Sequence, residues 1–173
     1  MNYTKQLFKF SGLKATFKIM MGMYILLTIP AAAVGFISHM IAFSQSDLDL
    51  LYEFTSGWNV VIIPAIAMFE EVFFVFPVVL LYSLSRDVNH RVVSKILVYL
   101  ALIALPVLSY QFMIGHAYQG AAMYPKGLYV LYSCFMMSRY GLPTSMAAHF
   151  LYDFSILGMA KILLTIAVAS GQL

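Results

Sequence analysis

The stretch Ala67-Met68-Phe69-Glu70-Glu71-Val72-Phe73-Phe74-Val75-Phe76 holds two adjacent glutamates inside an apolar run. The nearest charged residues on either side are Glu53 and Arg86, each more than a helical turn away. An ionisable group at bilayer depth costs about 2.5–3.5 kcal/mol to insert, and it is tolerated where it faces a bundle interior or a wet cavity. Glu70 and Glu71 are therefore the first candidates for a functional site.

The composition of the whole chain is that of an integral membrane protein. The 173 residues are 62% hydrophobic and 10% charged, whereas a soluble domain carries about 25% charged residues. Residues 19–46 and 96–125 contain no Asp, Glu, Lys or Arg, and each run exceeds the roughly 20 residues that a spanning helix needs. The few basic residues lie at predicted membrane edges, so we expect no nucleic-acid partner.

The apolar runs predict an all-α, polytopic transmembrane helix bundle of about five spans. The predicted spans are residues 19–43, 58–84, 96–118, 128–138 and 145–169. The fourth is short for a full crossing. Residues 1–18, with four lysines among phenylalanines, are expected to form a basic interfacial arm. Residues 19–173 would then form the transmembrane domain.

The distribution of Lys and Arg predicts a multi-pass protein of the cell membrane with its N-terminus in the cytoplasm. Eight of the ten basic residues obey this orientation, and Lys126 and Lys161 are the exceptions. Membrane lipid is therefore an expected partner. No pattern in the sequence indicates an oligomeric state.

The ionisable residues within the spans form three groups. Glu70 and Glu71 lie in the second span, about 100° apart around the helix axis, so they cannot point the same way. His116 lies in the third span, and His149 and Asp153 lie one helical turn apart on one face of the fifth.

Carboxylates and histidines that converge from three helices can hydrolyse an amide. A carboxylate deprotonates a water molecule, and histidines donate hydrogen bonds to the carbonyl oxygen as it becomes negative. Two other interpretations use fewer of these residues. Histidine and carboxylate side chains are zinc ligands, and a glutamate pair alone could bind substrate or couple protons in a transporter.

The ordered set Glu70-Glu71, Phe112-x-x-x-His116 and His149-x-x-x-Asp153 resembles the three motifs of a family of intramembrane proteases. This is the CAAX-protease and bacteriocin-processing family (CPBP, or Abi). Its pattern is Glu-Glu-x-x-x-Arg, then Phe-x-x-x-His, then His-x-x-x-Asn/Asp, on successive membrane helices. The resemblance covers residues 58–160 and implies a CAAX-protease-like fold.

The resemblance also implies an activity and a role for each residue. Glu70 would be the general base, Glu71 a second, supporting glutamate, and Asp153 the partner beside His149. His116 and His149 would polarise the scissile carbonyl. The implied function is that of an endopeptidase acting on a prenylated CAAX-type protein or on a peptide such as a bacteriocin precursor. No cofactor is expected, and zinc, which is disputed in the family, is the alternative.

One position departs from the family pattern. Val75 stands where the first motif has arginine. The departure leaves a second interpretation open, a catalytically inactive member that acts as a membrane immunity or scaffolding protein. If the carboxylates need a cation, Arg139 or Lys161 would have to supply it from another helix.

Depth is a further constraint on the site. At about 1.5 Å per residue, Glu70 lies near the middle of the membrane and His149 roughly 10 Å from the cytoplasmic edge. The two side chains can therefore meet only if the spans tilt, kink or begin elsewhere.

Overall fold

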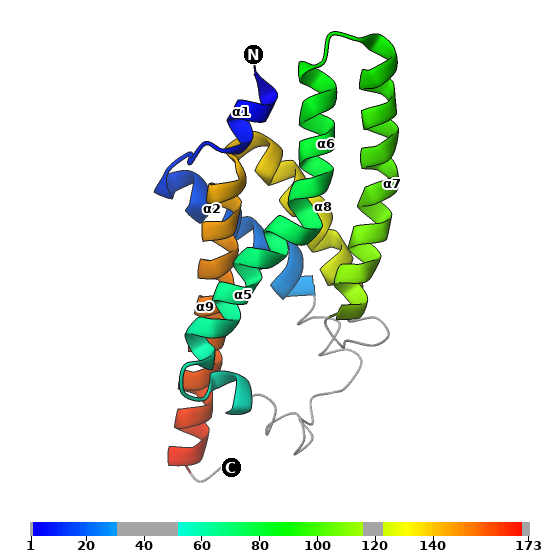
Figure 1. Ribbon diagram of the computed structural model, residues 1–173. Coiled ribbons are helices and arrows are strands. Elements are labelled where there is room, and N and C mark those ends of the chain that lie inside the picture. The colour runs from blue at the N-terminus through cyan, green and yellow to red at the C-terminus, as the bar shows by residue number, and fades with distance from the viewer. Residues whose placement is uncertain (1, 31–51, 116–122, 171–173) are drawn as a thin grey trace.

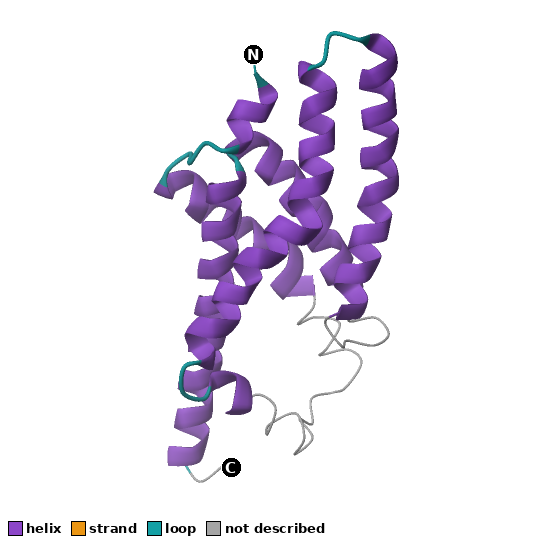
Figure 2. Ribbon diagram, viewed as in Figure 1, coloured by secondary structure: helices purple, strands orange, loops and turns teal. Residues whose placement is uncertain are grey.

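A computed structural model of the chain describes residues 2–30, 52–115 and 123–170 (Figure 1). Within these ranges every regular element is a helix (Figure 2). The predicted all-α class is therefore confirmed for the described part of the chain. Most of the first predicted span lies outside the described residues.

The elements are α1 (Tyr3–Leu7), α2 (Leu13–Met23), η1 (Tyr24–Thr28), α5 (Asn59–Glu70), η2 (Glu71–Val75), α6 (Phe76–Asp87), α7 (Arg91–Gly115), α8 (Met123–Tyr140) and α9 (Leu142–Ala169). The segments η1 and η2 are single π-helical turns. The second of them joins α5 and α6 into one continuous helix that contains both glutamates. Such π turns are often found at functional sites.

Three helices are long and apolar enough to cross a membrane, and they support the predicted membrane location. They comprise Asn59–Asp87, Arg91–Gly115 and Leu142–Ile166, which correspond to the second, third and fifth predicted spans. The fourth predicted span, residues 128–138, lies within α8, which has 18 residues. A five-span, CAAX-protease-like bundle stays a prediction.

The helices pack around a core that lies beside the glutamate pair. The most extensive contacts join α6 to α7 and α5 to α9, while α8 packs against α7 and α9 (Figure 1). Buried side chains from eight of the described elements form one hydrophobic cluster, among them Ile19, Val75, Phe112, Tyr129 and Ala148. This core fixes the crossing of η2 with α8 and α9, where the candidate site lies.

The N-terminal residues are docked on the bundle. The carboxylate of Asp87 accepts hydrogen bonds from the backbone N–H groups of Tyr3 (2.8 Å) and Thr4 (2.7 Å), and Leu7 has no exposed surface. Helix α2 runs without a break across the predicted boundary between residues 18 and 19. The residues of the predicted arm therefore join the end of α6 to the rest of the bundle.

Arg86 and Arg139 lie near α1 at one end of the molecule. The side chain of Gln6 donates a hydrogen bond to the backbone oxygen of Arg139 (3.0 Å), and Arg86 lies over the ring of Tyr3. Helix α1, the α8–α9 turn and the beginning of the α6–α7 turn therefore lie at the same end of the molecule, as Figure 1 shows. The cytoplasmic location of this end stays a prediction.

The same arrangement explains how the glutamate pair and His149 meet although the sequence predicts different depths for them in the membrane. Glu71 lies about 24 Å of helix before Asp87, whereas His149 lies about 10 Å beyond Leu142. Figure 1 shows that the α6–α7 turn projects well beyond the α8–α9 turn. The two side chains can therefore lie side by side although their helices begin at different heights.

Candidate active site

Glu71 is a fully buried carboxylate with a hydrogen-bond donor at each oxygen. Its side chain has no exposed surface. Its Oε1 accepts a hydrogen bond from the hydroxyl of Tyr129, and its Oε2 accepts one from Oγ of Ser145 at 2.9 Å. Hydrogen bonds of this kind offset the cost of burying the carboxylate. Both donors are hydroxyl groups from other helices, α8 and α9.

Tyr129 is held by aromatic packing on both sides. Its ring stacks on Phe112, with centroids 5.1 Å apart, and it tilts against the imidazole of His149 at 4.6 Å. Phe112 in turn meets the edge of Phe74 at 5.4 Å. The phenylalanine of the second motif therefore acts through packing, because it fixes the tyrosine that binds Glu71.

His149 lies between two groups of oxygen atoms. Its Nδ1 is 2.5 Å from the Tyr129 hydroxyl and 3.5 Å from Oε1 of Glu71. Its Nε2 is 3.6 Å from Oδ2 of Asp153 and 3.9 Å from Oε2 of Glu70. Because the hydroxyl hydrogen of Tyr129 goes to Glu71, the Tyr129 oxygen is free to accept from Nδ1. This assigns a hydrogen to Nδ1 and turns Nε2 toward the other two carboxylates.

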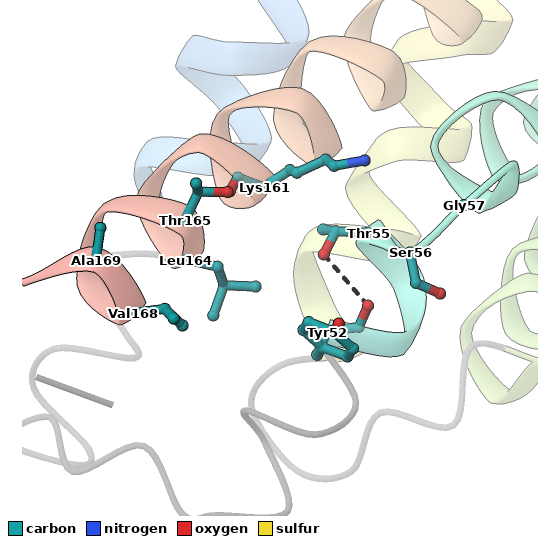
Figure 3. A pocket seen from close by; sticks show the side chains of 9 residues that line it. All are labelled: Tyr52, Thr55, Ser56, Gly57, Lys161, Leu164, Thr165, Val168 and Ala169. Atoms are coloured by element: carbon teal, nitrogen blue, oxygen red, sulfur yellow. Dashed lines mark hydrogen bonds between the residues drawn. The ribbon is translucent and has the colours of Figure 1, made fainter. Parts of the chain in front are cut away.

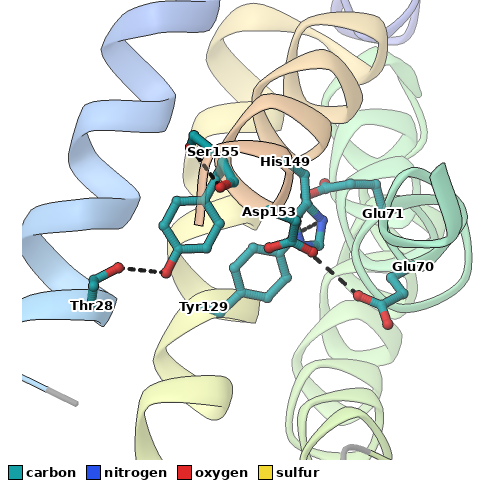
Figure 4. Close-up of polar contacts among 8 residues, drawn as sticks. Thr28, Glu70, Glu71, Tyr129, His149, Asp153 and Ser155 are labelled. Carbon is teal, nitrogen blue, oxygen red and sulfur yellow. Dashed lines mark hydrogen bonds and ion pairs between the residues drawn. The ribbon is translucent and has the colours of Figure 1, made fainter. Parts of the chain in front are cut away.

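The two sides of the imidazole differ in their access to solvent. The side chains of Glu70 and Asp153 are 21% and 25% exposed, whereas that of Glu71 is 0% exposed. Figure 4 shows Glu70 and Asp153 reaching toward His149 from α5 and α9. The adjacent glutamates thus approach opposite nitrogens of one ring, as their angular separation requires. Only the Nε2 side combines carboxylates with partial exposure.

A second polar contact fixes α9 next to Asp153. The hydroxyls of Thr28 and Tyr152 are 2.7 Å apart, and the hydroxyl of Tyr24 hydrogen-bonds to that of Ser155. Thr28 and Tyr24 belong to η1, so both π turns bind the same stretch of α9. Figure 4 shows Thr28 and Ser155 beside the Glu–His–Asp group.

The structure brings four of the five predicted site residues together, namely Glu70, Glu71, His149 and Asp153. His116 lies outside the described residues, directly after Gly115, the last residue of α7. Its place at the site therefore stays a prediction.

Two residues of the site, Tyr129 and Ser145, were not predicted from the sequence. Ser145 precedes His149 by four positions, as His149 precedes Asp153, so the three form one polar line along α9. That spacing could have identified Ser145. Tyr129 carries no comparable signal, because it is one of 12 tyrosines in an apolar chain.

Val75, which stands where the family motif has arginine, belongs to the hydrophobic core. Its side chain has no exposed surface and belongs to the cluster that contains Phe112 and Tyr129. Neither of the two cations suggested as substitutes contacts Glu71 in the structure: Arg139 lies over the ring of Tyr140, and Lys161 lines a separate cavity. No hydrogen bond or ion pair found among the described residues joins Glu71 to Arg139 or Lys161, and two hydroxyl groups serve the buried carboxylate instead.

The zinc alternative stays a prediction, because His116 lies outside the described residues. Among them, no group of three or more His, Cys, Asp or Glu side chains has the arrangement of a metal site. Both oxygens of Glu71 and Nδ1 of His149 are already used in hydrogen bonds. These atoms are therefore committed to holding the site together rather than to binding a metal.

The comparisons with known proteins offer no second structure or sequence with which to compare this site. No family model, no curated protein and no solved structure matches the chain. The observations that bear on function are therefore the Glu–His–Asp arrangement and the motif order in the sequence.

Proposed function

We propose that the chain is an intramembrane endopeptidase of the CPBP kind, in which Glu70 activates a water molecule. The observation that carries this proposal is the position of two partly exposed carboxylates, Glu70 and Asp153, at Nε2 of a buried histidine. A general base must reach both water and substrate, and Glu70 is the glutamate of the pair with exposed surface.

In the proposed hydrolysis each of these groups has one role. Glu70 accepts a proton from water as the water oxygen attacks the peptide carbonyl carbon. The negative charge that forms on the carbonyl oxygen is stabilised by His116 and by His149 in its doubly protonated form, in which Nε2 donates a hydrogen bond while Nδ1 keeps its own hydrogen. The carbon–nitrogen bond then breaks, and Glu70 returns the proton to the leaving amine. The products are a carboxylic acid and an amine, so one water molecule is consumed.

Glu71 acts in this scheme as a positioning residue. Its buried oxygens hold Tyr129 and Ser145, and Tyr129 in turn holds Nδ1 of His149. A fixed Nδ1 contact orients the imidazole, so that Nε2 faces the reacting groups. Of the two glutamates, the partly exposed Glu70 is thus the base and the fully buried Glu71 is the positioning residue.

The surface around Glu70 favours a substrate that arrives from the membrane. Ile66 and Phe73 lie four residues before and three residues after Glu70, on the same helix face. They are 54% and 65% exposed. An apolar or lipid-modified peptide would pack against them as it reached the base. This supports the proposed substrate class, a prenylated CAAX-type protein or an apolar peptide such as a bacteriocin precursor.

Val75 favours a second candidate function, an inactive relative that serves as a membrane immunity or scaffolding protein. The arginine of the family motif is replaced by a buried valine, and the carboxylate beside it is satisfied by hydroxyl groups. A site of this kind could retain its shape without catalysing hydrolysis.

The deciding experiment compares two glutamate variants in lipid nanodiscs. The full chain, Glu70→Gln and the matched control Glu53→Gln are incubated with a farnesylated CAAX peptide and with its unmodified twin. Products are identified by mass spectrometry. We expect cleavage by the parent and by Glu53→Gln, because Glu53 is exposed and outside the site, and none by Glu70→Gln.

The same experiment separates the alternatives. Cleavage by Glu70→Gln at the parental rate would show that Glu70 is not the base. An immunity effect that persists in a Glu70→Gln/His149→Ala double variant, with no cleavage by any form, would favour the scaffolding function.

A further inference from the structure

A cavity of about 470 Å³ lies between α9 and residues 52–57 (Figure 3). It is near the C-terminal end of α9, whereas Glu70 and His149 lie toward the other end of that helix. Its lining residues include Tyr52 and Ser56 on one side and Lys161, Leu164, Thr165 and Val168 on the other. None of them takes part in the proposed hydrolysis.

Lys161 gives the cavity a positive charge inside an apolar helix. The residue lies within the candidate span Leu142–Ile166, and its side chain is exposed. Figure 3 shows this side chain extending from α9 toward the segment that holds Thr55 and Ser56. None of the ion pairs found among the described residues includes Lys161. A cation within an apolar span is stabilised by an anion beside it.

Two hydroxyl groups of the cavity are set to accept hydrogen bonds. Oγ of Ser56 donates to the backbone oxygen of Glu53 at 2.9 Å, and Oγ1 of Thr165 donates to that of Lys161 at 2.8 Å. Because each hydrogen is used, each oxygen offers lone pairs to a ligand. The cavity therefore suits a ligand that has both an anion and hydrogen-bond donors.

The remaining wall is apolar. Leu164 and Val168 lie one turn apart on α9 and line the cavity with Ala169. This wall suits a hydrocarbon chain beside the charged group. A free inorganic anion would make no use of it.

We propose that this cavity binds an anionic glycerophospholipid whose headgroup carries hydroxyl groups, of the phosphatidylglycerol type. The phosphate would pair with Lys161, the headgroup hydroxyls would donate to Ser56 and Thr165, and an acyl chain would lie on Leu164 and Val168. A headgroup that carries an ammonium group fits less well, because it would place a second cation beside Lys161.

The test measures lipid binding by native mass spectrometry of the full chain released from detergent. The probes are phosphatidylglycerol, phosphatidic acid, phosphatidylcholine and glycerol phosphate. We expect the parent to bind phosphatidylglycerol most tightly, and Lys161→Met to bind it about fivefold more weakly, as befits one lysine at a membrane surface. Lys18→Met is the matched control, because Lys18 is an exposed lysine outside the cavity, and it should bind as the parent does.

Two further variants keep the result interpretable if Lys161→Met fails to fold. Lys161→Arg retains the charge and should retain binding. Thr165→Val removes an acceptor and should reduce the preference for phosphatidylglycerol over phosphatidic acid, which lacks the glycerol hydroxyls. Unchanged affinity in both Lys161→Met and Thr165→Val, or an equal loss in Lys18→Met, would overturn the proposal. Equally tight binding of glycerol phosphate would assign the cavity to a soluble anion.

Discussion

The hydroxyl of Tyr129 donates a hydrogen bond to the carboxylate of Glu71, although 58 positions separate the two residues in the sequence. Both side chains are buried, with 3% and 0% of their surface exposed. The same hydroxyl is 2.5 Å from Nδ1 of His149. One phenolic group therefore joins α8 to the π turn of the glutamate pair and to the histidine of α9.

Replacing Tyr129 with phenylalanine tests this connection. Tyr129→Phe preserves the stacking on Phe112 but leaves one oxygen of Glu71 without its donor. A buried acceptor that loses its partner costs about 1–3 kcal/mol, so the free energy of unfolding should fall by that amount and peptide cleavage should slow. Tyr132→Phe is the matched control, because its hydroxyl binds the backbone oxygen of Ile19 away from the site. It should lower stability slightly and leave the cleavage rate unchanged. Equal cleavage rates for the two variants would contradict the positioning role.

The two glutamates should respond differently to the same substitution. Glu70→Gln removes the proposed base, so the cleavage rate should fall about 10²–10⁴-fold with little change in stability. Glu71→Gln puts an amide N–H group where one hydroxyl donor now points, so it should lower the free energy of unfolding by about 1–3 kcal/mol. Chemical denaturation and kinetics on the same samples separate the two effects. Loss of stability in Glu70→Gln with no loss in Glu71→Gln would reverse the assignment.

Restoring the arginine of the family motif should harm this protein. Val75→Arg would place a long cation in a fully buried position within the core, where a charge without a dedicated partner costs several kcal/mol. We expect a large loss of thermal stability and no gain in cleavage. Val92→Arg is the control, because Val92 is 59% exposed on α7 and should tolerate the change. A stable Val75→Arg protein with faster cleavage would show that the position is an arginine site after all.

The features that the sequence predicted share a physical origin. A charge inside an apolar run has few tolerable environments, so the sequence alone was enough to assign Glu70, Glu71 and Asp153 to an interior site. The i, i+4 spacing of His149 and Asp153 placed both on one helix face. The three helices that are long and apolar enough to cross a membrane followed from run length alone. Each of these inferences uses a local property of the chain.

The features that escaped prediction depend on how the helices cross. Tyr129 looks like any other aromatic residue until α8 is placed against η2, because a neutral hydroxyl costs little to insert and is not conspicuous in an apolar helix. The π turn at Glu71–Val75 has no composition of its own. Likewise the basic arm reads as a surface segment, yet Leu7 is buried and Asp87 binds its backbone. Tertiary contacts determine all three.

The docking of this arm leads to a last prediction, which concerns two glycines. Gly12 and Gly141 share nearly the same backbone conformation, with φ of 91° and 87° and ψ of 168° and 159°. This region is nearly exclusive to glycine, and another residue there costs about 1–3 kcal/mol. Around Gly12 a new Cβ would meet nothing within 4 Å, whereas at Gly141 it would lie 2.2 Å from the backbone oxygen of Lys9. Gly141→Ala must therefore displace the arm as well as strain its own backbone. We expect it to lower the unfolding free energy more than Gly12→Ala does, and to speed amide hydrogen exchange at the residues of α1. Equal losses in the two variants, with unchanged exchange in α1, would show that the arm does not rest on the α8–α9 turn.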